Sequence, residues 1–145
     1  GELFTASRGG GAFINDRPIT AGPDTTLAES LLGTGFAYDP DRRARQAAVV
    51  QRLIPKVRDI RRLGVTSMDL CYVATGRLNA FYEPGLWPWD FAAGALIAAE
   101  AGAWVGDLDG GQPGRDVVLA CHRSVREAFL QAVEEAGARE VFGPR

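Results

Sequence analysis

The segment from Phe91 to Ala101 constrains the fold most strongly, because it reads as a helix that is apolar almost all round. Asp90 stands where a helix cap is expected, and Gly102 follows where a helix ends. A helix without a polar face has to be buried between other layers of structure. A membrane span is excluded, because the segment carries Glu100 and is shorter than the roughly 20 apolar residues that a span requires.

The rest of the chain alternates between predicted strands and predicted helices. A hairpin-like opening is predicted over residues 3–20, with glycines and an Asn-Asp turn between its strands. Further strands are predicted over residues 31–37, 59–63, 78–82, 103–108 and 116–120. Helix starts are predicted at Asp39-Pro40, at Thr66 or Ser67, at Asp90, and at a Ser124–Glu127 capping box. This alternation predicts one α/β layered domain over residues 1–145.

Composition and charge exclude several classes of protein. The chain of 145 residues is 46% hydrophobic and 23% charged, which is typical of a globular domain. Its net charge of −2 provides no field to attract nucleic acid or a membrane, so we expect neither as a partner. All but one of the basic residues are arginine, which indicates either phosphate recognition or biased codon usage.

Cysteine and histidine offer no conventional reactive site. Cys71 and Cys121 are far apart and lie in no metal-binding or redox spacing. We therefore expect reduced thiols and a cytoplasmic location. The single histidine, His122, falls between a predicted strand and a predicted helix, and we interpret it as a structural or solvated residue.

Two short segments, residues 64–67 and 83–90, combine polar side chains with glycine or proline between a predicted strand and a predicted helix. Glu83 ends a predicted strand, and Asp90 stands at a helix start, where the helix dipole favours an ionised carboxylate by about 0.3–1 kcal/mol. An ionised carboxylate is also what a hard cation requires. Gly64-Val65-Thr66 forms a strand–glycine–helix junction whose free N–H groups can bind an oxyanion or a hydroxyl. Each feature also has an ordinary explanation, as a helix cap, a solvated strand end or a turn.

The segment Trp89–Gly102 resembles the second signature of the inositol monophosphatase family, a W-D-x-A-A-G pattern followed by E-A-G. The likeness extends to residues 73–83, 61–64 and 3–13, and so covers nearly the whole chain. It implies the C-terminal portion of a layered αβαβα sugar-phosphatase fold, with a mixed sheet packed with helices.

The same resemblance implies roles for particular residues. Asp90 would be a ligand of a catalytic Mg²⁺, and Glu83 would accept a hydrogen bond from a substrate hydroxyl. Gly64, Val65 and Thr66 would contact the substrate at the start of their helix. The resemblance assigns no general acid, general base or nucleophile to this chain.

The activity that the resemblance implies is hydrolysis of a phosphate monoester by a metal-activated water, dependent on Mg²⁺ and sensitive to Li⁺, in a homodimer. The expected substrate is inositol monophosphate or a related sugar or polyol phosphate. Glu83 favours a polyol, while histidinol phosphate, fructose bisphosphate and adenosine bisphosphate remain as alternatives.

The sequence departs from the family in one important respect. The family's first signature, an acidic D-P-x-D-G-T segment with most of the metal ligands, does not occur, because Asp39-Pro40-Asp41 is followed by arginines. The chain also opens on a predicted strand without a methionine. We therefore expect the N-terminal half of the enzyme to be absent from this chain and to be its partner. The isolated chain is expected to be inactive, because one carboxylate rarely holds Mg²⁺ tightly. The alternative is a non-catalytic dimerisation or binding module.

Overall fold

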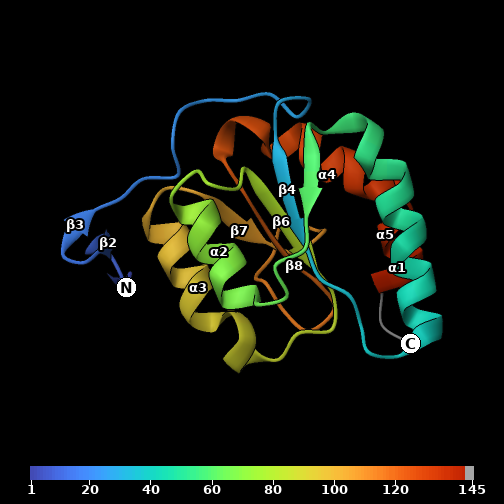
Figure 1. Cartoon of the computed structure of the whole chain (residues 1–145), viewed down its shortest axis with the longest axis horizontal. Helices are drawn as coiled ribbons and strands as arrows, with labels where there is room; N and C mark the ends of the chain where they lie inside the picture. Colours follow the sequence, from blue (N-terminus) through green and yellow to red (C-terminus); the bar gives the residue numbers. More distant parts are fainter. Residues whose placement is uncertain (143–145) are drawn as a thin grey trace.

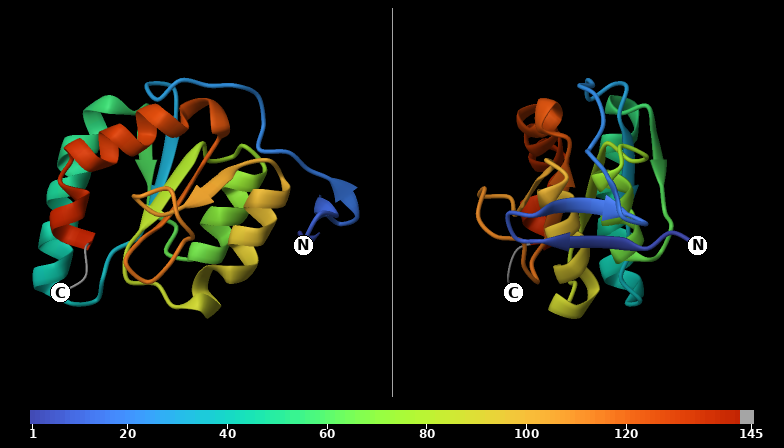
Figure 2. Two further views of the ribbon diagram at one scale, coloured as in Figure 1. Left: turned by 180° about the vertical axis from the view of Figure 1, so that it is seen from behind. Right: turned by 90° about the vertical axis from the view of Figure 1, so that its left-hand side faces the viewer.

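The computed structural model describes residues 1–142, which form alternating layers of sheet and helix (Figure 1). A small antiparallel sheet contains β1 (Phe4–Ser7), β2 (Gly11–Ile14) and β3 (Arg17–Pro18). It packs against α3 (Pro88–Glu100), which lies beside α2 (Thr66–Ala74) on one face of a larger sheet. The opposite face is covered by α1 (Pro40–Leu53), α4 (Arg126–Glu135) and α5 (Ala138–Phe142) (Figures 1 and 2).

The larger sheet has five strands in the order β5-β4-β6-β8-β7. Their bounds are β4 Leu31–Thr34, β5 Asp59–Arg61, β6 Ala80–Glu83, β7 Trp104–Gly106 and β8 Val118–Cys121. β4 pairs in parallel with both β5 and β6, whereas β8 runs antiparallel to β6 and β7. The carboxyl ends of β4, β5 and β6 and the start of β8 therefore meet at one edge of the sheet.

Two hydrophobic clusters fill the space on the two faces of this sheet. Successive side chains of a strand point to opposite faces. In β6, Phe81 accordingly packs with α2 and α3, while Ala80 and Tyr82 pack with α1, α4 and α5. Phe142 of α5 stacks on Tyr82, with ring centroids 5.7 Å apart. The predicted mixed sheet packed with helices is confirmed.

Among the predicted helix caps, only that of α1 agrees with the structure, where Asp39 accepts a 2.7 Å hydrogen bond from Arg42 N–H. The predicted cap at Asp90 is wrong, because Pro88 begins α3 and Trp87 is its N-cap. Asp90 lies one turn further in and accepts a hydrogen bond from Trp87 N–H at 2.9 Å.

α2 begins at Thr66, as predicted, but the predicted caps of α2 and α4 are wrong. Neither Thr66 nor Ser67 caps α2, whose N-cap is Val65. Ser124 does not cap α4, because its hydroxyl bonds to the backbone of Thr25. A short 3₁₀ turn over Arg123–Val125 then leads into α4. The predicted strands are present but shorter, and the strand predicted over residues 31–37 ends at Thr34.

The predicted burial of the apolar helix is correct on one side only. α3 contacts α2, the β1–β2 hairpin of the small sheet, and β7 and β8 of the larger sheet. Gly94 of α3 lies against Leu70 of α2. Ala92, Ala93 and Ala99 are nevertheless exposed, because small side chains leave little apolar surface in water. The absence of a polar face thus reflects a helix rich in alanine rather than one enclosed on every side.

Glu100 of α3 fixes the hairpin to this helix. Its two carboxylate oxygens accept hydrogen bonds from Gly9 N–H at 2.8 Å and Gly11 N–H at 2.9 Å, and these bonds lower the pKa of Glu100.

In Glu100→Gln an acceptor oxygen becomes a donor amide, so we expect faster hydrogen exchange at the backbone amides of Gly9 and Gly11. Glu127→Gln, on the exposed face of α4, is the control. Unchanged protection of the two glycine amides in Glu100→Gln would contradict this role.

Candidate active site

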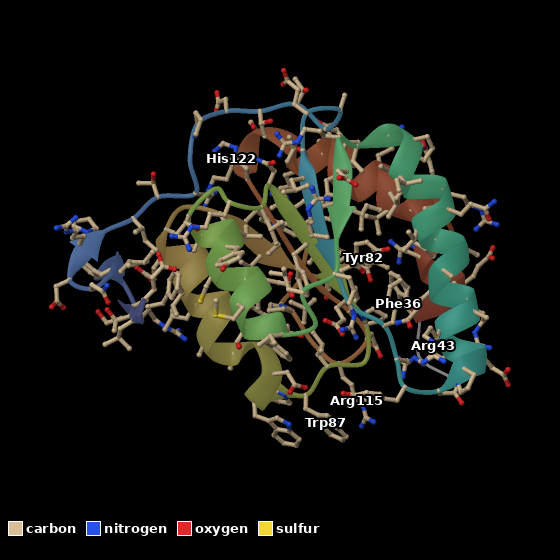
Figure 3. All side chains as sticks on the ribbon, viewed as in Figure 1. Phe36, Arg43, Tyr82, Trp87, Arg115 and His122 are labelled. Atoms are coloured by element: carbon tan, nitrogen blue, oxygen red, sulfur yellow. The ribbon has the colours of Figure 1, made fainter. Side chains whose placement is uncertain are left out.

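A cavity of about 620 Å³ lies at the edge of the sheet where the parallel strands end. Its walls come from residues 36–39 after β4, residues 62–67 after β5, residues 83–90 after β6, and Arg115 before β8. Figure 3 places Trp87 and Arg115 at this end of the molecule and His122 at the opposite end. Open α/β sheets bind ligands at the carboxyl ends of their strands. Both segments predicted from the sequence therefore meet at a suitable place.

Glu83, the last residue of β6, lies in the wall of this cavity and is held from two sides. Its Oε2 accepts a 2.8 Å hydrogen bond from the Thr66 hydroxyl. A Cβ atom at Gly35 would overlap the carboxyl carbon and both carboxylate oxygens of Glu83, so any larger residue there would require the Glu83 side chain to move. Burial raises the pKa of Glu83, against the lowering effects of the Thr66 hydrogen bond and the charge of Arg62. Glu83 is therefore a half-buried, hydrogen-bonded residue of the cavity wall and not a solvated strand end.

Gly64, Val65 and Thr66 form the junction between β5 and α2, as predicted, and all three line the cavity. Gly64 has a φ of +83°, a left-handed backbone conformation that favours glycine. α2 begins at Thr66, so its first turn is adjacent to the cavity. The first N–H groups of a helix have no partner within it, and they can bind a ligand oxygen.

Asp90 lies in the same cavity, on the first turn of α3. Its Oδ2 accepts the hydrogen bond from Trp87 N–H, which fixes the carboxylate at the cavity wall. Mg²⁺ prefers oxygen ligands and is commonly held by one or two carboxylates together with substrate phosphates. Asp90 fits one of these positions. Within residues 1–142, no group of three or more His, Cys, Asp or Glu side chains could hold a metal ion.

An aromatic and basic wall completes the cavity: its tryptophans lie in the predicted segment 83–90, whereas its arginines lie outside both predicted segments. The guanidinium of Arg115 lies 3.7 Å from the ring centroid of Trp87, and Trp87 stacks on Trp89 with centroids 5.2 Å apart. Arg42 lies beside Gly85, where a Cβ would come within 2.8 Å of a guanidinium nitrogen. These guanidinium groups can attract an anionic ligand. Neither Arg42 nor Arg115 carries a local sequence signal for this position.

The remaining conventional candidates have structural roles. The His122 ring contacts Ser124 Oγ at 2.8 Å and Gly22 O at 3.1 Å, which confirms that this histidine joins two loops. Cys71 and Cys121 are buried free thiols, and burial raises their pKa to about 11 and about 12. Both cysteines are therefore uncharged and unreactive at neutral pH.

The fold and the site together define a layered α/β protein with a carboxylate-bearing cavity at the ends of parallel strands. The sequence matches the model of the inositol monophosphatase family over residues 1–138, and the chain belongs to that family. This match confirms the resemblance carried by the Trp89–Gly102 segment. Among the described residues, no helix is both long enough and apolar enough to cross a membrane.

Individual relatives agree with this assignment. The chain is 43% identical over 140 residues to a Mycobacterium leprae protein named inositol-1-monophosphatase, covering 92% of this chain and 48% of the relative. It is 38% identical over 153 residues to a Xylella fastidiosa protein named Nus factor SuhB, covering 99% and 56%. The solved inositol monophosphatase of Anabaena superposes with a TM-score of 0.85 at 35% identity, covering 92% and 54%. The chain thus spans about half the length of the relatives it matches.

Proposed function

We propose that this chain forms part of a Mg²⁺-dependent phosphatase that hydrolyses inositol monophosphate or a related sugar or polyol phosphate. The observation that carries the proposal is the convergence of Glu83, Thr66 and Asp90 in one cavity, in a chain of the inositol monophosphatase family. Relatives named inositol-1-monophosphatase support this choice of substrate.

Each residue of the cavity has a distinct proposed task. Asp90 would supply a carboxylate ligand, and the chemistry expected of bound Mg²⁺ is neutralisation of phosphate charge and activation of a water molecule. Because Thr66 occupies Oε2 of Glu83, Oε1 is the atom proposed to accept a hydrogen bond from a substrate hydroxyl. The N–H groups at Gly64, Val65 and Thr66 would bind substrate oxygens.

We further propose that the other metal ligands belong to an acidic segment outside this chain, in the N-terminal half of the enzyme. Two observations support this: no group of three or more His, Cys, Asp or Glu side chains within residues 1–142 could hold a metal ion, and the matched relatives are about twice as long. The complete enzyme is proposed to be a cytoplasmic, Li⁺-sensitive homodimer, as the family resemblance implies.

The division of the active site between two halves can be tested by measuring phosphate release from inositol 1-phosphate. The chain of residues 1–145 alone is expected to release phosphate at least about 100-fold more slowly than the same chain joined to an N-terminal half with the D-P-x-D-G-T signature. The activity of the joined protein should disappear when EDTA removes Mg²⁺. Rapid Mg²⁺-dependent hydrolysis by the isolated chain would contradict the division.

The same assay separates the alternative functions. A non-catalytic dimerisation or binding module would release no phosphate even when joined to its N-terminal half. Faster release from histidinol phosphate, fructose bisphosphate or adenosine bisphosphate than from inositol 1-phosphate would change the proposed substrate and retain the proposed reaction.

A further inference from the structure

Asp69 of α2 is a buried carboxyl group to which neither the sequence nor the proposed reaction assigns a task. The residue is only 1% exposed, and its Oδ1 has no hydrogen-bond partner among the described residues. A buried carboxylate without a partner is energetically costly, and such groups commonly remain protonated. The position of Asp69 therefore calls for an explanation.

Two glycines of the neighbouring chain bring Asp69 close to Glu83. Gly33 lies in β4 beside Phe81 of β6, and Gly35, just after β4, lies beside Glu83. Phe81 and Glu83 are two residues apart in β6 and so point to the same face of the sheet. A Cβ at Gly33 would lie 3.0 Å from Asp69 Oδ1, and a Cβ at Gly35 would overlap the Glu83 carboxylate. Thr66, which donates to Glu83, lies one helical turn before Asp69 on α2. The two carboxyl groups thus occupy adjacent spaces that the glycines leave open.

The charges around Asp69 make it sensitive to pH near neutrality. Burial and the negative charge of Glu83 raise the pKa of Asp69 to about 7, and the positive charge of Arg62 opposes them. Glu83 approaches from β6 and Arg62 from the segment before α2. The residue of β4 that faces Asp69 is Gly33, which has no side chain and therefore no charge. As pH rises through about 7, a second negative charge therefore develops beside Glu83.

We infer that Asp69 is a positioning residue, which supports Glu83 in its substrate-binding orientation while Asp69 is uncharged and repels Glu83 once Asp69 ionises. A second negative charge beside the half-buried Glu83, with Arg62 as the nearby cation, is unfavourable, and the Glu83 side chain can shift toward the cavity that it borders. The role of Glu83 as acceptor of a substrate hydroxyl rests on the proposed function. The electrostatic pairing of Asp69 with Glu83 does not depend on the proposed function.

A titration of the chain of residues 1–145 tests the pairing without any assay of activity. Carbon-13 NMR of the side-chain carboxyl groups should show Asp69 titrating near pH 7. In Glu83→Gln, which removes the neighbouring charge, the midpoint of Asp69 should fall by about one pH unit. Asp24→Asn, at an exposed loop position, is the matched control and should leave the midpoint unchanged. An identical midpoint in Glu83→Gln and in the wild type would overturn the pairing.

The effect on the substrate is tested with the complete enzyme and inositol 1-phosphate. In the wild type, KM is expected to rise by up to about tenfold per pH unit above pH 7, with a smaller change in kcat. Asp69→Asn cannot ionise, so its KM should stay constant over that range, while Asp24→Asn should follow the wild type. Parallel KM profiles in the wild type and Asp69→Asn would overturn the positioning role. An enzyme without phosphatase activity but with the coupled NMR titration would refute the proposed function and leave the pairing established.

Discussion

Asp90→Asn is expected to lower Mg²⁺-dependent phosphate release from inositol 1-phosphate by more than about 100-fold, since even residues that only orient metal ligands contribute 10–100-fold. The substitution removes the negative charge proposed to bind Mg²⁺. It retains an oxygen that can accept the hydrogen bond from Trp87 N–H, so α3 should still begin at Pro88. The measurement is phosphate release as a function of Mg²⁺ concentration in the complete enzyme.

The control for this experiment is Asp24→Asn, which makes the same chemical change outside the cavity. Circular dichroism should show the same helix content in both variants and in the wild type. If Asp90→Asn turned over at the wild-type rate at every Mg²⁺ concentration, Asp90 would not be a metal ligand.

Gly35→Ala is expected to displace the Glu83 side chain from the cavity wall, because the new Cβ would overlap its carboxylate. Glu83 would then lose its hydrogen bond from Thr66. We expect the free energy of unfolding to fall by about 1–3 kcal/mol, the cost of a broken buried hydrogen bond. The KM for inositol 1-phosphate should rise by about tenfold, which corresponds to about 1.4 kcal/mol of binding free energy.

Gly114→Ala provides the matched control, because a Cβ at Gly114 would meet no described heavy atom within 4 Å. Denaturant unfolding of the chain of residues 1–145 gives the stability change, and steady-state kinetics of the complete enzyme give KM. Wild-type stability and wild-type KM in Gly35→Ala would show that Glu83 does not need the space that Gly35 leaves.

The sequence was sufficient to predict the architecture, because the pattern of strands and helices depends on local periodicity. It was not sufficient to predict which side chains cap the helices, because alternative hydrogen bonds compete for those side chains. The Thr66 hydroxyl could cap α2 or bind Glu83, and the choice depends on β6, which lies next to α2 only in the folded chain. α5 was missed for a related reason. The short helix packs through Phe142 on Tyr82, a contact between residues that are distant in sequence.

The candidate site shows the same division between local and tertiary information. Glu83 and Asp90 stand out in the sequence because they flank a short, stiff loop, and the structure places them in one cavity. Asp69 and Gly35 carry no such signal, because their importance depends on how closely β4 approaches α2 and β6. Arg115 joins the site only because β8 runs antiparallel to β6, which brings the segment before β8 to the cavity.

The assembly of the cavity from four separate stretches of chain has a consequence for its folding kinetics. Residues 36–39, 62–67, 83–90 and 115 meet only after β4, β5, β6 and β8 have paired, and the parallel pairs require long crossover connections. Contacts between such distant residues form late and slow the folding of a chain. A partly folded segment therefore cannot form the cavity. The cavity lasts only as long as the strands of the larger sheet remain paired.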